Sequence, residues 1–391
     1  MTQARNKQII WHIGDPKTGT SSIQQALKSA SVEIEGKKIA CYSSDGIKAN
    51  AIGPARSLIA ENTKRIKTHF KRIEHWAQET DADYLVVSAE AFSQVNPQVL
   101  NRVGKKFLAD FWDDTRVIYY CRPHSSRFLA AFAQQVKTGS YLGEYEDFAD
   151  KIAKQKTLFF TRRARAWNKI FGDRFTVRPF SRSELYQNDA VADFVHTVHG
   201  ASNFKLAEKT ETNQSVSLKT LSALRLFHGY FQTNGRDNGT KVARLMARTI
   251  FNHHLGAFET TSELPKLDAV TAATLYDTYI EDAQQMDAEF FDGKPFLVKA
   301  LTKARDTAKG TSNDLSLETH YSQDEIAQVK ELMVKIDETF QKAPMSAWVD
   351  YLNFTKTPEL LERQQIENLE KNHELVGKMD DFLSEFASVS S

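Results

Sequence analysis

The sequence predicts an α/β protein in which a central parallel sheet carries helices on both faces, in three layers. Two observations lead to this fold class. Short runs rich in β-branched and aromatic residues alternate with amphipathic segments through the first half of the chain. That alternation is typical of parallel strands joined by crossover helices. After about residue 202 the strand signals weaken while helical spacing continues, so we expect a helical C-terminal portion to follow the sheet.

The strands and helices of the first half are expected in strict alternation. Strands are predicted at residues 9–13, 38–42, 84–88, 116–121 and 175–179. Helices are predicted after them, at residues 21–30, 55–79, 99–111, 123–137 and 183–199. Gly200 favours the end of the last helix, because glycine readily adopts the left-handed backbone found there. Since ligand groups gather at the carboxyl ends of parallel strands, the residues after each strand are the first candidates for a site.

The second half is expected to be helical. Apolar residues recur at helical spacing over residues 218–231, 242–251, 269–286 and 326–340. The segment 357–386 is charged and also helical in pattern. We expect one body over residues 1–345 and a C-terminal helical extension over 346–391. That extension packs either on the body or on a second copy of the chain, as a homo-oligomer.

Composition and charge narrow the class of protein. The chain has 391 residues, 41% of them hydrophobic, enough for one or two domains with a large core. Its formal net charge is +1, so no general attraction to nucleic acid or anionic lipid is expected. The two cysteines, Cys41 and Cys121, lie in apolar strand-like runs and are expected to be reduced. A polar start and the lack of a long apolar run predict a cytoplasmic protein without transmembrane segment.

The segment after the first predicted strand has the composition of an anion-binding loop. It reads Gly14-Asp-Pro-Lys-Thr-Gly-Thr-Ser-Ser22 and leads directly into a predicted helix. Backbone N–H groups in such a loop and first helical turn lack internal partners, and the helix dipole favours an anion there. The alternative is a turn that only joins strand to helix, which leaves its lysine unexplained. The candidate anion ligands are Lys17, Thr18, Gly19, Thr20, Ser21 and Ser22.

The position of the lysine separates this loop from the loop that binds nucleoside triphosphates. That loop carries Lys-Ser/Thr directly after its second glycine. Here Gly14 and Gly19 have the required separation, but Thr20 follows Gly19 and the lysine lies at position 17. No Lys-Ser/Thr pair is therefore available to hold magnesium beside a triphosphate. A kinase-like phosphotransferase is nevertheless the nearest alternative among enzymes.

The run His12-Ile-Gly-x-x-Lys-Thr-Gly-Thr20 resembles the 5′-phosphosulfate loop of sulfotransferases that use 3′-phosphoadenosine 5′-phosphosulfate (PAPS). This spelling is typical of the bacterial, carbohydrate-directed members of that family. The resemblance implies a three-layer fold with a P-loop-like phosphosulfate loop. It implies PAPS as the donor, adenosine 3′,5′-bisphosphate (PAP) as the product, and no metal. It also implies that Lys17 acts in catalysis and that residues 18–22 bind the 5′-phosphate.

A second candidate anion site follows the fourth predicted strand. Arg122 ends that strand, and the proline after it suits the first turn of the next helix. The order strand–Arg–Pro–helix resembles the family's element for the 3′-phosphate, which implies that Arg122 and Arg127 bind this group. The serine usual eight residues after the arginine is replaced by Ala130, and Ser126 or its neighbour Ser125 is expected to supply the hydroxyl. The alternative is an arginine paired with a nearby carboxylate.

The candidate general base is Glu90, two residues past the third predicted strand. In a parallel sheet it lies at the same edge as Lys17 and Arg122, and transfer to an alcohol needs a group that takes the hydroxyl proton. The alternatives are a glutamate that caps the next element or pairs with an arginine. His12 and His124 are rival bases. His12 lies within the first strand, where a buried structural role fits equally well.

The resemblance covers about residues 8–235 and implies transfer to a hydroxyl of a saccharide or glycolipid. Two basic clusters, at residues 64–72 and 162–165, either serve an acidic acceptor or form solvated helix faces. The histidines lack acidic or cysteine neighbours at metal-ligand spacing, so no metal site is expected. The rival from another class is a nucleotide-binding scaffold without activity, which the missing serine favours.

Overall fold

The structure is a computed structural model that describes residues 7–44, 49–207, 216–233, 243–247, 263–310, 313–342, 348, 352 and 373–390. The chain divides into two compact units, and each is described by itself. Unit 1 comprises Met1–Arg127, Gln155–Thr212 and Ala272–Thr307, and unit 2 comprises Phe128–Lys154, Asn213–Thr271 and Ala308–Ser391. The expected boundary between residues 345 and 346 lies outside the described residues and stays a prediction.

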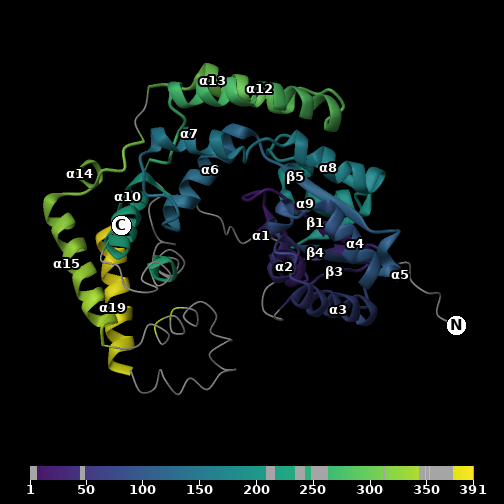
Figure 1. The fold of residues 1–391 in the computed structure, drawn as a ribbon, viewed down its shortest axis with the longest axis horizontal. Helices are drawn as coiled ribbons and strands as arrows, with labels where there is room; N and C mark the ends of the chain where they lie inside the picture. The colour runs from purple at the N-terminus through teal and green to yellow at the C-terminus, as the bar shows by residue number, and fades with distance from the viewer. Residues whose placement is uncertain are drawn as a thin grey trace. The chain divides into compact units, whose positions relative to one another are not determined.

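Unit 1 is built on a five-stranded parallel sheet (Figure 1). Its strands are the five that the sequence predicts: β1 Gln8–His12, β3 Ile39–Cys41, β4 Tyr84–Ser88, β5 Arg116–Cys121 and β6 Phe175–Pro179. They lie in the order β3-β4-β1-β5-β6. In the register, Ile10 of β1 lies opposite Val86 of β4 and Arg116 of β5. After β1, the chain first forms β3 and β4 on one side of it and then β5 and β6 on the other side. The strand order therefore reverses at β1, and the carboxyl end of β1 is the topological switch point of the sheet.

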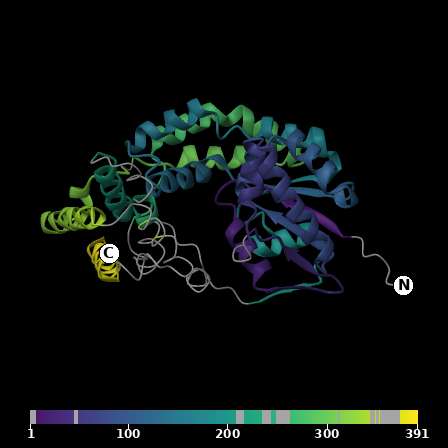
Figure 2. The same cartoon turned by 60° about the horizontal axis from the view of Figure 1, so that its bottom comes forward.

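Helices cover both faces of this sheet (Figure 2). Successive residues of a strand point to opposite faces, so neighbouring residues of one strand pack against different helices. On one face, Ile10 and Tyr120 belong to a core with residues of α1, Thr20–Lys28, and α9, Ala190–His199. On the other face, the indole of Trp11 lies beside rings of the opposing helices. The helices of that second face are α3 Thr63–Glu79, α4 Pro97–Phe107, α5 Ala109–Trp112 and α8 Thr161–Phe171. Unit 1 is therefore a three-layer α/β arrangement.

Two helices predicted as continuous are each divided in two. Residues 55–79 form α2, Ile52–Ile59, and α3. The division falls at Glu61, which has a left-handed backbone with φ 45°, and at Asn62, whose side chain caps α3. Residues 99–111 form α4 and α5, because the backbone leaves the helical region between them. In each case a local break interrupts an apolar pattern that continues across it.

The helix predicted at residues 183–199 begins only at Ala190, as α9. It is preceded by the 3₁₀ turn η3, Tyr186–Asn188, in which two residues have left-handed backbones. The side chain of Asp189 then caps α9 by accepting two backbone N–H groups. The predicted end of the helix is confirmed, because Gly200 terminates it with φ 78°.

Two strands and two α-helices described between residues 32 and 206 are absent from the sequence prediction. β2, Val32–Ile34, pairs antiparallel with β7, Phe204–Leu206, as a separate two-stranded ribbon. A strand of three residues carries too short a pattern to be recognised. The other two, α7 Tyr145–Gln155 and α8, lie between β5 and β6. They follow α6, His124–Lys137, the helix that was predicted there.

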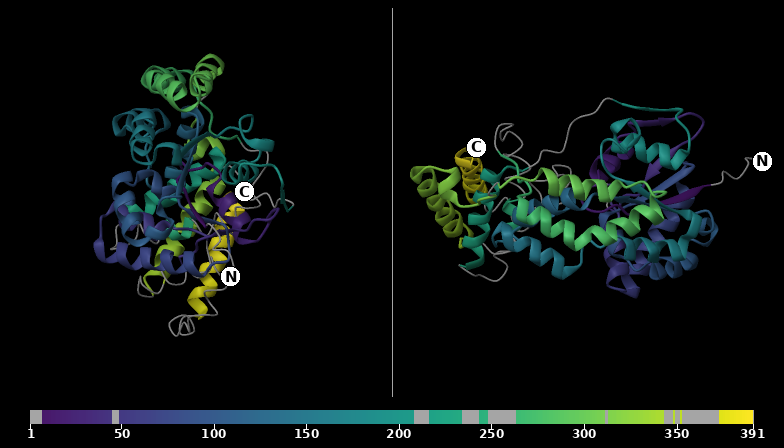
Figure 3. Two further views of the ribbon diagram at one scale, coloured as in Figure 1. Left: turned by 90° about the vertical axis from the view of Figure 1, so that its right-hand side faces the viewer. Right: turned by 90° about the horizontal axis from the view of Figure 1, so that it is seen from above.

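Unit 2 consists of helices in its described residues. Besides α7 and most of α6, it holds α10 Leu218–Thr233, α14 Leu317–His320, α15 Gln323–Phe340 and α19 His373–Ser390. α15 and α19 lie side by side (Figure 3). Together with α10 they enclose an apolar core that includes Phe227, Met333 and Phe386. The last helix therefore packs on helices of its own chain.

The helices predicted in the second half are confirmed where the structure describes them. Residues 218–231, 269–286 and 326–340 belong to α10, α12 Ala269–Phe290 and α15, and α13 Phe296–Thr307 was not predicted. Of residues 242–251 only 243–247 are described, and they are helical. Of residues 357–386, those from 373 onward belong to α19 and the others lie outside the described residues. None of the helices described here combines the length and apolar character needed to cross a bilayer.

Candidate functional site

Three predicted site residues meet at the carboxyl edge of the sheet in unit 1. Lys17 lies in the loop after β1, Glu90 begins the 3₁₀ turn η1, Glu90–Gln94, after β4, and Arg122 follows β5. The backbone N–H of Lys17 donates to Glu90 Oε1 at 3.3 Å. Arg122 Nη1 donates to the carbonyl oxygen of Lys17 at 2.8 Å. Because β4, β1 and β5 are neighbours in the sheet, their ends bring a cation, a carboxylate and a guanidinium together.

The backbone of the loop between β1 and α1 is tightly constrained. A Cβ at Gly14 would lie 2.5 Å from Thr18 Oγ1, so a side chain there would displace the threonine. Gly19, the N-cap of α1, has φ 73°, which glycine adopts without strain. Lys17 also has a positive φ, 67°, which is uncommon for a residue with a Cβ. Residues with such backbone conformations are found more often at ligand-binding sites. The loop therefore turns sharply at Lys17 before it enters α1.

Several donors at the start of α1 have no acceptor among the residues that the structure describes. The backbone N–H groups of Gly19, Thr20 and Ser21 make no hydrogen bond there, because the N-cap has no side chain to accept one. The buried hydroxyl of Thr20 is also unpartnered. These donors lie at the positive end of a helix dipole, where an anion is favoured. Of the neighbouring candidates, Ser22 is half-buried and the Thr18 hydroxyl donates to the carbonyl oxygen of Asp15.

The two arginines after β5 have no carboxylate partner in the described structure. Arg122 Nε donates to Ser126 Oγ at 3.0 Å, so Ser126 supplies a hydroxyl beside the guanidinium. Arg127 makes no hydrogen bond or ion pair with a described side chain, and its Nε is buried. Burial and the like charge of Arg127 lower the pKa of Arg122. Two neighbouring guanidinium groups with no carboxylate within ion-pair distance among the described residues favour binding of an anion such as a phosphate.

Glu90 is the carboxylate at this edge, and its pKa is raised. Burial is the main cause of the rise, while the N–H and ammonium of Lys17 and the guanidinium of Arg127 act in the opposite direction. The ammonium of Lys17 is exposed and forms no ion pair within the described ranges. A half-buried carboxylate with a raised pKa beside a cation is suited to accept a proton.

His12, the first rival base, lies beneath the loop and is fully buried. The amide nitrogen of Gln24 donates to Ser88 O at 3.1 Å and to Ser88 Oγ at 3.0 Å. The Ser88 hydroxyl also lies 2.9 Å from His12 Nδ1. Burial lowers the pKa of His12 to about 3. The imidazole is therefore neutral, and its Nε2 has no partner in the described structure. A ring with so low a pKa is a weak base, which leaves Glu90 as the stronger candidate.

His124, the second rival base, is enclosed at the start of α6. Its ring is fully buried and lies between the rings of Phe160 and Tyr279, with centroids 4.5 Å and 5.1 Å away. Nε2 lies 3.7 Å from Asp282 Oδ2, too far for a hydrogen bond. Asp282 instead accepts the backbone N–H groups of Phe160 and Thr161 at the start of α8. Enclosure among these groups fits a structural role for His124.

Three residues of this edge escaped the sequence prediction. Asp15 lies two residues before Lys17 and is 2% exposed. Its Oδ1 accepts from Arg163 Nη1 at 2.7 Å, and its Oδ2 accepts from the hydroxyl of Tyr119 at 2.9 Å. The signal in the sequence is the carboxylate itself, because an acidic residue inside an anion-binding loop requires a cation nearby.

The two basic clusters have different surroundings. In the cluster at residues 162–165, Arg163 pairs with Asp15 and Arg165 pairs with Glu289, so two of its three cations are occupied within unit 1. The cluster at residues 64–72 lies on α3. None of its lysines or arginines has a carboxylate within ion-pair distance among the described residues. Among the described residues, every cation of the cluster at 64–72 is therefore without an ion pair, whereas in the cluster at 162–165 only Arg162 is.

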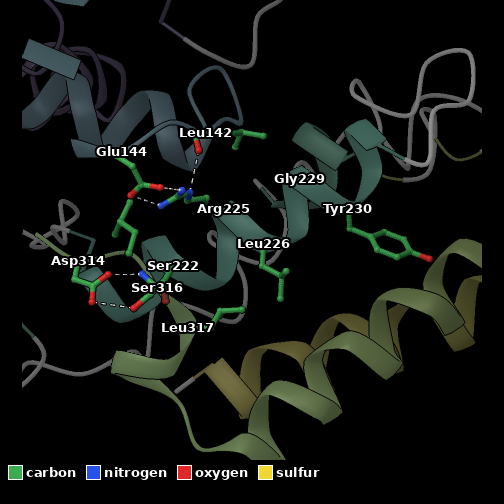
Figure 4. A pocket seen from close by; sticks show the side chains of 11 residues that line it. Leu142, Glu144, Ser222, Arg225, Leu226, Gly229, Tyr230, Asp314, Ser316 and Leu317 are labelled. Atoms are coloured by element: carbon green, nitrogen blue, oxygen red, sulfur yellow. Dashed lines mark hydrogen bonds and ion pairs between the residues drawn. The ribbon is translucent and has the colours of Figure 1, made fainter. Parts of the chain in front are cut away.

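Unit 2 contains a hollow of about 360 Å³ around α10 (Figure 4). Its central cation, Arg225, donates from Nε to Leu142 O at 2.9 Å and holds the carboxylate of Glu144 with both other nitrogens. Asp314 accepts the N–H and the hydroxyl of Ser316. Tyr230 extends from α10 away from the Arg225–Glu144 pair. The hollow contains none of the predicted site residues.

No known protein-family model matches this chain, and no curated protein matches it significantly. Within the described residues, no group of three or more His, Cys, Asp or Glu side chains is arranged to hold a metal ion. The chemistry of the strand-end site in unit 1 is therefore the basis for proposing a function.

Proposed function

We propose that the chain is a sulfotransferase that moves a sulfuryl group from PAPS to an acceptor hydroxyl. The observation that carries the proposal is the set of groups around Lys17. Helix-start donors, an exposed ammonium, two guanidinium groups without carboxylates and one carboxylate with a raised pKa lie at the ends of three adjacent strands. This set suits a ligand with two separate phosphate-type anions and a reaction that needs a base.

The residues at hand fit such a donor in two places. The unpartnered N–H groups of Gly19, Thr20 and Ser21 with the Thr20 hydroxyl would bind the 5′-phosphate. Arg122 and Arg127 would bind the 3′-phosphate, with Ser126 beside them in place of the family's usual serine. A dianion bound between them would offset the like-charge repulsion between Arg127 and Arg122.

In the proposed reaction, the acceptor oxygen attacks sulfur while the bond between sulfur and the bridging phosphate oxygen breaks. PAP leaves with the electrons of that bond, and the acceptor proton passes to a carboxylate oxygen of Glu90. Lys17 would stabilise the negative charge that grows on the leaving oxygen. Burial keeps the pKa of Glu90 above its ordinary value, which makes it a stronger base than a solvent-exposed carboxylate.

The proposed acceptor is a hydroxyl of a saccharide or glycolipid. A sugar hydroxyl is a poor acid, so its transfer requires a base within hydrogen-bond reach. The carboxylate of Glu90 meets that requirement beside Lys17, and the loop spelling resembles that of carbohydrate-directed sulfotransferases. A cytoplasmic location and assembly into a homo-oligomer through the C-terminal helices stay predictions.

Two rival functions are kept for the test. A kinase-like phosphotransferase would need a lysine directly after Gly19, where Thr20 stands. A nucleotide-binding scaffold without activity is favoured only by Ala130. The hydroxyl of Ser126 at 3.0 Å from Arg122 Nε weakens that argument, because it offers a replacement for the missing serine.

The deciding experiment measures binding of PAP and ATP by calorimetry, followed by turnover of PAPS with a panel of saccharide acceptors. We expect PAP to bind more tightly than ATP, with or without magnesium, and PAPS to be consumed with release of PAP. Preference for ATP with magnesium would favour the kinase. Tight PAP binding without turnover on any acceptor would favour the scaffold.

A further inference from the structure

The loop that we propose as the anion site contains a buried negative charge. Asp15 lies two residues before Lys17, and its side chain is 3% exposed. A buried carboxylate this close to an anion site opposes binding unless a cation balances it, because charges interact strongly where water is excluded. Asp15 therefore needs an explanation that the nucleotide ligands alone do not give.

The contacts of Asp15 fasten the loop to two other elements. Its backbone N–H donates to Tyr120 O at 3.1 Å, and its carbonyl oxygen accepts the hydroxyl of Thr18. Its carboxylate accepts from Tyr119 of β5 and from Arg163 of α8. Arg163 also lies 3.3 Å from the Tyr119 hydroxyl, so the three side chains form one connected group. The residues immediately before and after the turn at Lys17 are held by this group.

We propose that Arg163 is a positioning residue for the anion site, acting through Asp15. It holds the carboxylate of Asp15 in place and cancels its charge, so that the loop keeps its shape without repelling the bound anion. The inference rests on the proposed function, because it assumes that the loop binds the phosphate end of a nucleotide. It adds a residue of α8, distant in sequence, that touches neither phosphate nor sulfuryl group.

The charge of Asp15 is felt across the site. The pKa of Glu90 is raised mainly by burial, and Asp15 adds to the rise by electrostatic repulsion. Arg163 is the only cation within ion-pair distance of Asp15 among the described residues. Without it, the unbalanced carboxylate would act on any anion bound at the loop as it acts on Glu90.

The test is a double-mutant cycle read by PAP binding. Arg163→Met removes the guanidinium while keeping much of the side-chain bulk, and we expect it to weaken PAP binding about tenfold, through an unbalanced charge. Asp15→Asn removes the charge but keeps an oxygen that accepts the Tyr119 hydroxyl. The double variant Asp15→Asn/Arg163→Met should therefore regain most of the lost affinity, to within about threefold of wild type. If the bond between Asp15 and Arg163 only stabilised the fold, Asp15→Asn would not restore PAP affinity to the Arg163→Met variant.

The matched control is Arg165→Met, on the same helix. Arg165 pairs with Glu289 instead of the loop, so PAP affinity should stay unchanged. Thermal unfolding is measured for every variant. If Arg163→Met does not fold, Arg163→Gln takes its place, because it also removes the charge but keeps an amide N–H that can donate to Asp15. The cycle then compares Arg163→Gln with Asp15→Asn/Arg163→Gln.

Three outcomes decide the inference. Weaker binding that Asp15→Asn restores supports it. Unchanged binding in a folded Arg163 variant, or a loss that Asp15→Asn leaves in place, overturns it. Inorganic pyrophosphate serves as a second probe to separate the two proposals. If wild type binds pyrophosphate but not PAP, the nucleotide donor is misassigned and the cycle is read with pyrophosphate; if it binds neither, both proposals are overturned.

Discussion

The strand-end site of unit 1 and the hollow of unit 2 differ in how their charged groups are satisfied. In the hollow, Arg225 is bonded to Glu144 and to a carbonyl oxygen, and Asp314 is bonded to its own loop. At the strand ends, Arg122 has only neutral partners and Arg127 has none among the described residues. The hollow has the more obvious space, whereas the strand-end site has the unbalanced charge.

This difference teaches that unsatisfied polar groups locate chemistry better than space does. Buried polar groups are nearly always hydrogen-bonded, so a concentration of unpartnered donors calls for a ligand. Around α1 and α6 the unpartnered atoms are Thr20 Oγ1, Arg127 Nε, His12 Nε2 and both ring nitrogens of His124. In the hollow, the charged side chains of Arg225 and Asp314 already have partners. The following variants test whether the contrast holds, beginning with the largest expected effect.

Glu90→Gln should have the largest effect on turnover. Glutamine keeps an oxygen that can accept the Lys17 N–H but cannot take a proton, so kcat should fall about 10²–10⁴-fold with PAP affinity near wild type. The pKa of Glu90 is raised above its ordinary value of 4.5. The fall of wild-type kcat/KM at low pH should therefore have its midpoint above pH 4.5. The variant should show no such fall.

The control for Glu90→Gln is the pair His12→Asn and His124→Asn, assayed on the same acceptor. We expect both to keep turnover within about tenfold of wild type when folded, because neither ring is placed to take the proton. An inactive His12→Asn together with an active Glu90→Gln would show that the base is misassigned.

Lys17→Ala should have the next largest effect. Removing the ammonium takes away stabilisation of charge that develops only in the transition state, so turnover should fall on the order of 10²-fold or more. Binding of PAP, which has no sulfuryl group, should weaken far less. Lys28→Ala, at the other end of α1, is the matched control. Equal losses in turnover and in PAP affinity would mean that Lys17 only holds the ground state.

Arg122→Ala should weaken binding of the 3′-phosphate only. We expect PAP binding to weaken by roughly 1.5–3 kcal/mol, the range for a hydrogen bond to a charged group. Adenosine 5′-phosphosulfate lacks the 3′-phosphate, so its affinity should change little. This comparison also detects damage to the loop, since Arg122 holds the carbonyl oxygen of Lys17. Such damage would weaken both nucleotides alike.

Arg225→Met, in the hollow of unit 2, should have the smallest effect. Its partner Glu144 is largely exposed, and exposed ion pairs contribute little, so the free energy of unfolding should fall by about 1 kcal/mol or less. Nucleotide affinity and turnover should stay within about twofold of wild type. A larger loss of turnover would contradict the contrast between the two regions.

The sheet and the residues that gather at its carboxyl edge were predictable because each depends on local sequence. All five strands are short runs with clear β propensity, and the order of the chain places the residues after them at one edge. Lys17, Glu90 and Arg122 could therefore be assigned to one site before any contact was known. That the loop binds an anion stays a prediction, drawn from its position before a helix.

What escaped prediction depends on distant or very local contacts. Asp15 and Arg163 are 148 residues apart, and no periodicity links them. The division between α2 and α3 depends on the single cap at Asn62, which the apolar pattern does not reveal. For His12 the sequence allowed either a base or a buried structural ring. The full burial of the ring and its contact with the Ser88 hydroxyl are visible only in the structure.

The left-handed backbone of Lys17 has a consequence for how this chain is conserved or engineered. A side chain with a Cβ is strained in that conformation by roughly 1–2 kcal/mol, whereas glycine is not. The strain is maintained from both sides, by Glu90 on the N–H and Arg122 on the carbonyl oxygen. Selection for thermostability alone would therefore favour glycine at position 17, and selection for activity would oppose it. Stability and function pull in opposite directions at this residue.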